Sequence, residues 1–87
     1  MFRVILIPKA QKQLERVPKS HKARIAAVID GLANDPYGGK KLEGDLAGYY
    51  AVRVWPYRVV YTIERAIVTV KVVLIGHRQS VYERLRR

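Results

Sequence analysis

The sequence has no cysteine, few acidic residues and only short hydrophobic runs. The absence of cysteine excludes disulfide bonds and thiolate metal sites. The apolar run at residues 1–7 is too short for a signal peptide, and Lys71 interrupts the other long run, so we expect a soluble cytoplasmic protein without membrane contact. The two histidines and seven carboxylates show no metal-ligand spacing, so we expect neither a metal nor another cofactor.

Positive charge, by contrast, is abundant. Seventeen Lys and Arg residues against seven Asp and Glu residues give a formal charge of +10. This excess indicates a polyanionic partner, with nucleic acid as the first candidate, although basic residues could also merely keep the protein soluble. The 87 residues are expected to form one domain, residues 1–87. A domain of this size buries only about 60–65% of its unfolded surface, so any site should be a shallow groove.

The N-terminal half predicts a strand followed by two helices. Residues 2–7 are rich in Val and Ile and end at Pro8, which suits the first turn of a helix. Pro18 ends the first helix, Ser20 can cap a second one, and residues 34–36 stop it. We therefore expect an antiparallel helical hairpin with two apolar stripes. The stripes contain Ala10, Leu14 and Val17 in the first helix, and Ile25, Val28, Ile29 and Leu32 in the second.

The C-terminal half changes to an alternating pattern, which is typical of β-strands. Residues 37–41 form a predicted loop, and Trp55-Pro56 forms a turn between the first two strands of a three-stranded antiparallel meander. One face of this sheet is expected to be apolar and to pack on the helices. Its residues are Tyr50, Val52, Val54, Tyr57, Val59, Tyr61, Ile63, Val68, Val70, Val72 and Leu74. The other face, here called the arginine face, is the candidate working surface and carries Arg53, Arg58 and Lys71.

The candidate catalytic residues lie in two segments, YYAVRVWPYRVVY and GHRQSVY. RNA cleavage without a metal needs a base for the 2′-hydroxyl, cations for the phosphorane and an acid for the 5′-oxygen. Arginine does not deprotonate in proteins, so Arg53, Arg58 and Arg78 are expected to hold the substrate and stabilise charge. His77 and Tyr82 rank nearly equal as proton-transfer groups. Further RNA-binding candidates are Lys40, Lys41, Tyr49 and Lys71.

Each candidate also has a purely structural interpretation. Arg53 and Arg58 could be solvated positions on an exposed sheet face, and His77 could be a polar residue at a strand end. Tyr82 could anchor a short C-terminal helix. The other tyrosines are more simply explained by packing, because aromatic residues favour strands. Tyr49 is the exception that merits a test, because it faces the arginine side.

The order of elements and several dispersed motifs resemble the RelE/ParE superfamily of bacterial and archaeal toxins. The matching segments are residues 42–44, 50–54, 57–61, 76–78 and 81–82, and the resemblance extends over nearly the whole chain. It implies an α+β fold in which two helices pack on a twisted antiparallel sheet. The expected order is an N-terminal strand, the two-helix antiparallel hairpin, the three-stranded meander and a short C-terminal helical tail.

This superfamily divides by function. RelE-like members cut messenger RNA in the ribosomal decoding site, whereas ParE-like members poison DNA gyrase and lack the catalytic set. The RelE-like pattern matches Arg53, Arg58, Arg78 and Tyr82, but Ala51 departs from it, because the better-known RelE toxins carry a lysine there. The identity of the general base therefore stays open. The resemblance implies a metal-independent, ribosome-dependent endoribonuclease, or mRNA interferase, with a gyrase-inhibiting toxin as the alternative and a plain RNA-binding module as a third interpretation.

The resemblance also implies partners. These are the ribosome, its messenger RNA and a cognate acidic antitoxin of the RelB type. A protein of charge +10 with an arginine face suits an acidic, partly disordered antitoxin that wraps it and folds on contact.

Overall fold

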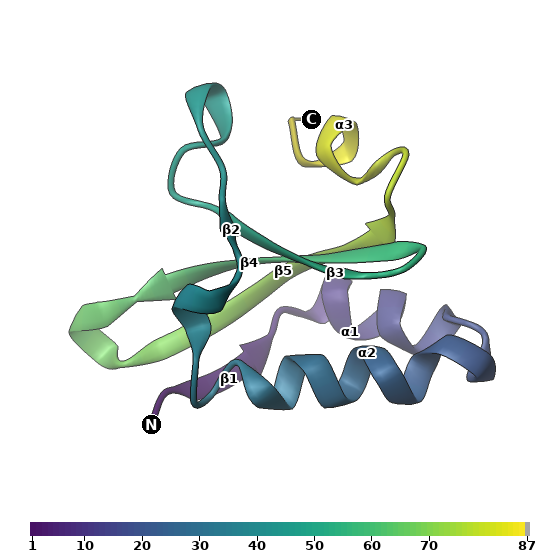
Figure 1. The fold of residues 1–87 in the computed structure, drawn as a ribbon, viewed down its shortest axis with the longest axis horizontal. Helices are drawn as coiled ribbons and strands as arrows, with labels where there is room; N and C mark the ends of the chain where they lie inside the picture. The colour runs from purple at the N-terminus through teal and green to yellow at the C-terminus, as the bar shows by residue number, and fades with distance from the viewer. Residues whose placement is uncertain (87) are drawn as a thin grey trace.

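The computed structural model describes residues 1–86 and has the predicted α+β fold (Figure 1). Its strands are β1 (Arg3–Leu6), β2 (Lys40–Lys41), β3 (Tyr50–Val54), β4 (Tyr57–Glu64) and β5 (Thr69–His77). Its helices are α1 (Pro8–Arg16), α2 (Lys19–Gly31) and α3 (Val81–Arg86), and single 3-10 turns lie at Pro36–Gly38, Gly44–Leu46 and Arg65–Ile67. Within this range no helix has both the length and the apolar character needed to cross a bilayer.

The strands form one sheet in the order β1-β5-β4-β3-β2. The predicted meander is confirmed, because β3, β4 and β5 pair in antiparallel fashion. The antiparallel sheet that the resemblance implied is extended by β1, which runs parallel to β5, with Arg3 opposite Thr69. Parallel strands need a long crossover connection, and the segment that contains α1, α2 and the other strands provides it.

Helices α1 and α2 cover one face of the sheet, as Figure 1 shows, and the main hydrophobic core lies between the two layers. Pro8 occupies the first turn of α1, as predicted. The core contains Ala10, Val17, Ile25, Ile29 and Leu32 from the helical segment, and Val54, Val59, Tyr61, Val70, Val72 and Ile75 from the sheet. The predicted apolar face therefore packs on the helices, with two exceptions. Val68 is one of them, because it precedes β5 in a left-handed backbone conformation and is 48% exposed.

The other exception is Leu74, and its cause is a β-bulge. The register between β4 and β5 shifts between Val60 and Tyr61, so that Val60 pairs with Leu74 and Tyr61 with Val72. Val73 is the extra residue, and beyond it every side chain of β5 exchanges faces. Leu74 consequently packs on the opposite face from Val72, which corrects the prediction.

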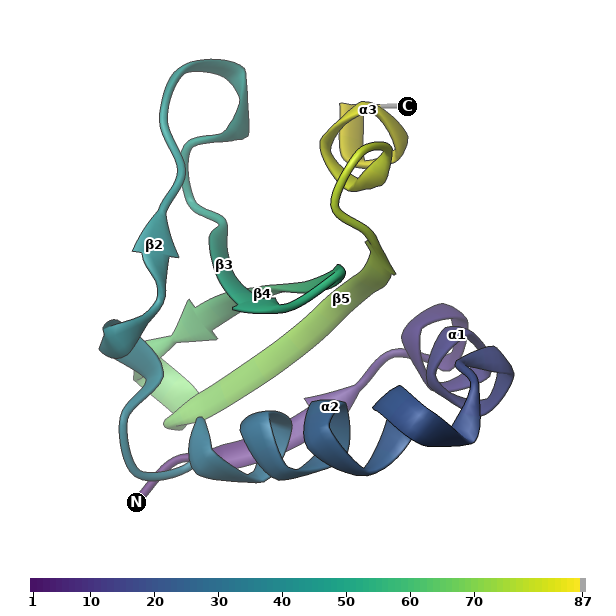
Figure 2. The ribbon, with the colours of Figure 1, turned by 45° about the vertical axis from the view of Figure 1, so that its right-hand side comes forward.

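A second, smaller hydrophobic cluster lies on the arginine face. It contains Leu42, Leu46, Ala51, Val60, Leu74 and Val81, with Tyr49, Val73, Tyr82 and Leu85 packed against it. The cluster attaches the segment after β2 and helix α3 to the sheet, and both rise from this face in Figure 2. The two elements thereby stand on either side of the candidate working surface.

Two local predictions are also corrected. Ser20 does not cap α2, because the helix begins at Lys19 with Pro18 as its N-cap, and the carbonyl oxygen of Pro18 accepts the N–H groups of His21 and Lys22. The predicted loop at 37–41 contains the short strand β2, which pairs with β3. A two-residue edge strand is too short to produce an alternating pattern that a sequence can reveal.

Candidate functional site

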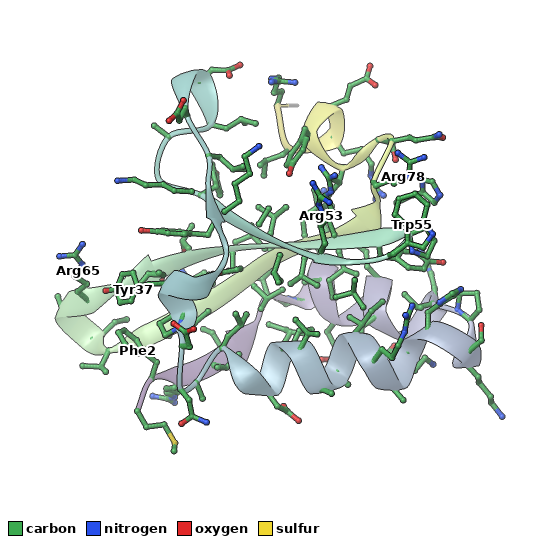
Figure 3. The ribbon with its side chains drawn as sticks, in the orientation of Figure 1. Phe2, Tyr37, Arg53, Trp55, Arg65 and Arg78 are labelled. Atoms are coloured by element: carbon green, nitrogen blue, oxygen red, sulfur yellow. The ribbon has the colours of Figure 1, made fainter. Side chains whose placement is uncertain are left out.

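A small basic pocket lies on the arginine face. Its lining residues are Lys40, Ala51, Val52, Arg53, Arg58 and Tyr82, contributed by β2, β3, β4 and α3. The cavity measures about 50 Å³, which gives room for a few water molecules or a group the size of a phosphate. Figure 3 shows Arg53 above the sheet, on the side opposite α1 and α2. The small volume of this pocket agrees with the expectation that a chain of this length has no large internal cavity.

The two arginines of the pocket are directly opposite each other on neighbouring strands. Arg53 of β3 pairs in register with Arg58 of β4. Like charges at directly opposed positions destabilise a sheet. The Arg53–Arg58 pair is therefore expected to lower the folding stability of the sheet. This cost favours a functional role for the two arginines over the interpretation that they are simply solvated side chains.

Arg58 is half-buried and has no acidic partner among the described residues. Within residues 1–86 the ion pairs join Lys71 to Glu64, at 3.1 Å, and Arg86 to Asp45, at 3.0 Å. The Nε atom of Arg58 is buried without a hydrogen-bond acceptor. A charged group removed from water in this way is costly unless it is paired and hydrogen-bonded. An anion that enters the basic pocket would supply the missing acceptor.

Tyr82 reaches the pocket from helix α3. Nη1 of Arg58 donates a hydrogen bond to the Tyr82 hydroxyl at 3.1 Å, and the Arg58 guanidinium carbon lies 5.4 Å from the centre of the Tyr82 ring. Because the Tyr82 oxygen accepts from Arg58, its own proton is available to another acceptor. The packing of α3 depends on buried Val81 and on Gly76, where an added Cβ would lie 3.2 Å from Arg84 Nη1 and 3.5 Å from Val81.

Lys40 lies beside Ala51 at the edge of the pocket. The two residues are register partners in β2 and β3, whereas Lys41 pairs with Tyr50 and does not line the pocket. The segment before Lys40 is fixed by Tyr61, whose hydroxyl donates to the Pro36 carbonyl oxygen at 2.7 Å. Burial raises the pKa of Tyr61, which keeps this donor protonated. Lys40 thus places an amine next to Ala51, the position at which the better-known RelE toxins carry a lysine.

Arg78 lies outside the residues that line the pocket. Its N–H donates to the Pro56 carbonyl at 2.9 Å, and its guanidinium carbon lies 4.3 Å from the centre of the Trp55 ring. Figure 3 shows this pair at one end of the sheet, with Arg53 nearby on the same side. The sequence identified Trp55 as a turn residue but not as a partner of Arg78. The signal available was a lone tryptophan in a turn between two basic strands.

His77 is on the opposite face from the basic pocket. It pairs with Tyr57 in β4, its ring centre lies 6.2 Å from that of Tyr57, and it shares a separate surface depression with Gln13 and Arg16 of α1. The structure therefore does not bring His77 together with Tyr82. The bulge in β5 explains this placement, because it moves His77 to the helix side.

The remaining candidates, Lys71 and Tyr49, do not line the pocket. Lys71 is on the arginine face, but it pairs with Thr62, four positions along β4 from Arg58, and forms an ion pair with Glu64. Tyr49 packs against the smaller hydrophobic cluster and does not line the pocket. Among residues 1–86 no group of three or more His, Asp or Glu side chains is arranged to hold a metal ion.

Comparisons with known proteins agree on one family. A family model described as "ParE toxin of type II toxin-antitoxin system, parDE" matches residues 4–82. The curated protein Toxin RelG of Mycobacterium tuberculosis is 31% identical over 77 residues, which cover 86% of this chain and 88% of that protein. The domain is therefore a toxin of a type II toxin–antitoxin system.

Solved structures support the same assignment. The toxin–antitoxin complex RelBE2 from Mycobacterium tuberculosis matches with a TM-score of 0.81 and 29% identity, covering 88% of this chain and 98% of that chain. The archaeal RelE–RelB complex from Pyrococcus horikoshii matches with a TM-score of 0.75 and 27% identity, covering 88% and 94%. The chain belongs to the RelE/ParE superfamily, which confirms the resemblance found in the sequence.

Proposed function

We propose that this toxin is a ribosome-dependent endoribonuclease that cuts translated messenger RNA. The observation that supports this proposal best is the basic pocket, where two opposed arginines, a lysine and a tyrosine surround a cavity of phosphate size. A phosphodiester would give the half-buried Arg58 guanidinium the acceptor that it lacks. A surface that only attracted polyanions would not need an unpaired, half-buried charge.

The residues of the pocket divide the chemistry between them. In this reaction the 2′-oxygen attacks the phosphorus, its proton passes to a base, and the 5′-oxygen leaves with a proton from an acid. Arg53 and Arg58 stabilise the extra negative charge of the phosphorane, and Lys40 holds a phosphate oxygen. Tyr82 gives its free proton to the 5′-oxygen, because its oxygen already accepts from Arg58.

The pocket has no strong general base among its lining residues. Its lining residues are two arginines, a lysine, a tyrosine and two aliphatic side chains, and His77 is on the other face. A site without a strong base depends on correct attack geometry, which can lower a reaction barrier by about 7–11 kcal/mol. The ribosome would supply this geometry by holding the messenger RNA in place, and the enzyme would be slow on free RNA.

The alternative is a gyrase-inhibiting toxin without nuclease activity. The observations that favour it are the match to the ParE toxin model over residues 4–82 and the alanine at position 51. In this case the basic pocket would contribute only to binding. The retained set of Arg53, Arg58 and Tyr82 around one cavity favours the nuclease.

The nuclease and the gyrase inhibitor are distinguished by which nucleic acid is cut, messenger RNA or DNA. Purified toxin incubated with ribosomes that translate a defined message should produce cuts inside codons, detected by primer extension, and should leave the same free message nearly intact. A parallel reaction with gyrase and supercoiled plasmid should show no linear, gyrase-bound DNA. Rapid cutting of free RNA would contradict ribosome dependence, and intact RNA with linearised plasmid would establish the gyrase alternative.

We further propose an acidic antitoxin as the partner. The matched structures from Mycobacterium tuberculosis and Pyrococcus horikoshii are toxin–antitoxin complexes, and this chain carries charge +10. Complementary charge would steer the encounter, and a disordered acidic segment could cover the basic pocket or displace α3.

Expression of this chain alone should arrest growth, and co-expression with a short acidic protein encoded beside it should restore growth. The two proteins should co-purify, and added salt should slow their association more than it speeds dissociation. A catalytically weakened variant should retain the complex, since binding does not need the chemistry. Harmless expression of the toxin, with no acidic protein retained on purification, would contradict this partner.

A further inference from the structure

The turn between β3 and β4 presents an exposed indole ring. Trp55 is the sole tryptophan of the chain, and 62% of its surface is exposed. Among residues 1–86 the two hydrophobic clusters contain neither its ring nor its neighbour Pro56. Trp55 therefore contributes little to the core, although large aromatic side chains usually stabilise a small domain through burial.

The exposed ring is nevertheless held in place. The Arg78 guanidinium lies over the ring at 4.3 Å, while the Arg78 N–H bonds to Pro56 of the same turn at 2.9 Å. From the other side of the turn, Nη2 of Arg24 in α2 donates to the Trp55 carbonyl oxygen. These three contacts fix the turn, the ring and the cation together. A fixed aromatic surface with a guanidinium on it binds planar groups at a low entropic cost.

The fixed ring is close to the basic pocket. Trp55 follows Arg53 by two residues, which corresponds to roughly 7 Å along a strand. In Figure 3, Arg53, Trp55 and Arg78 lie at the same end of the sheet. A single-stranded polynucleotide bound by its phosphate at Arg53 and Arg58 can thus reach this ring with an adjoining base.

We propose that Trp55 and Arg78 form a stacking platform for one nucleobase of the RNA strand whose phosphate occupies the basic pocket. This inference rests on the proposed function, because it requires a polynucleotide in that pocket. Aromatic side chains bind single-stranded nucleic acid by stacking with its bases, and arginine adds a cation–π contribution. The platform gives Arg78 a role in positioning the substrate, while Arg53 and Arg58 act on the reacting phosphate.

The other end of the sheet provides a matched control. Tyr37 is 47% exposed, and the Arg65 guanidinium lies 5.7 Å from its ring centre. Its ring also contacts Phe2 and Tyr50 edge to face, with centre separations of 6.1 and 6.3 Å. Figure 3 shows Phe2, Tyr37 and Arg65 at the opposite end from Trp55. This aromatic and cationic pair has a packing role and is remote from the pocket.

Fluorescence of the single tryptophan tests the platform without any cleavage. The probe is a 2′-O-methyl RNA heptamer, which lacks the attacking hydroxyl, and its control is an abasic oligonucleotide of equal length and charge. The heptamer should quench Trp55 saturably, whereas the abasic strand should bind by charge with much less quenching. In W55F/Y37W, where the fluorophore moves to the far end, the heptamer should cause little quenching. Trp55→Ala and Trp55→Tyr contain no tryptophan, so their affinity is measured by the anisotropy of a labelled heptamer. Trp55→Ala should weaken heptamer binding about 5-fold or more, and Trp55→Tyr should restore most of it.

Equal quenching by both oligonucleotides, or equal quenching in W55F/Y37W, would overturn the platform. So would unchanged heptamer affinity in Trp55→Ala, or quenching by an acidic peptide and not by RNA, which would assign the ring to a protein partner. Failure of the proposed nuclease is distinguishable from these outcomes. If the heptamer quenches Trp55 but the toxin does not cleave ribosome-bound message, the proposed nuclease is wrong and the platform stands. If the toxin cleaves the message but the heptamer does not quench Trp55, only the platform is overturned.

Discussion

Arg58→Ala is expected to lower the single-turnover rate of cleavage on ribosome-bound messenger RNA by about 10²–10³-fold. Within residues 1–86 Arg58 has no acidic partner, and its buried Nε has no acceptor, so the guanidinium is available to the phosphorane charge. A loss of this size corresponds to about 2.7–4 kcal/mol of transition-state stabilisation. Arg58→Lys should recover only part of the rate, because an ammonium lacks the bidentate fork of a guanidinium.

Lys41→Ala is the control for lost charge. Lys41 is next to Lys40 in β2, but it pairs with Tyr50 and does not line the basic pocket. Its removal should weaken binding slightly, in a salt-dependent manner, and leave the rate of the bound complex unchanged. Equal and modest affinity losses in Arg58→Ala and Lys41→Ala would show that Arg58 is merely part of an electrostatic surface.

Tyr82→Phe is expected to lower the same rate by about 10² or more, with little change in melting temperature. The substitution keeps the ring that packs beside Arg58 and removes the hydroxyl that accepts from it. General acid catalysis typically contributes 10²–10⁴-fold to the rate, whereas the substitution keeps the packing of the ring and removes a single hydrogen bond from the folded state. Single-turnover kinetics and thermal unfolding of the same preparation separate the two effects.

His77→Gln is the matching variant for the other candidate. Because His77 is on the helix side of the sheet, its replacement should be mild. The reverse order, with a severe His77→Gln and a mild Tyr82→Phe, would assign proton transfer to His77 in spite of its position. Two mild variants would leave the proposed nuclease without a proton-transfer group from this chain.

The sequence predicted the elements of this fold well because their signals are local. The alternation in β3 and β4 placed Arg53 and Arg58 on one face correctly, and Pro8 marked the first turn of α1. The parallel pairing of β1 was not predictable from such signals, since it depends on contacts between distant parts of the chain.

One extra residue in β5 accounts for two of the errors. The expected alternation placed Leu74 on the helix side, and its continuation would have placed His77 on the arginine face. The bulge at Val73 places Leu74 on the arginine face and His77 on the helix side, because each residue beyond the bulge points to the opposite face from the one expected. A bulge formed by ordinary aliphatic residues leaves no turn signal in the sequence. The pairing of Lys40 with Ala51 was also not predictable, because β2 is only two residues long and shows no alternating pattern.

The pairing of the first strand with the last has a consequence for how the protein is synthesised. Strand β1 leaves the ribosome first, but its neighbour in the sheet, β5, is translated after all the other strands. Such distant pairings slow folding, because the loop between the partners must close before the contact is made. A nascent chain that stops before residue 69 has no β5, and therefore lacks the centre of its core and the support for α3. Premature termination should consequently yield harmless fragments. Under the proposed function, the ribosome that makes this toxin would be exposed to its activity only after almost the whole domain has been translated.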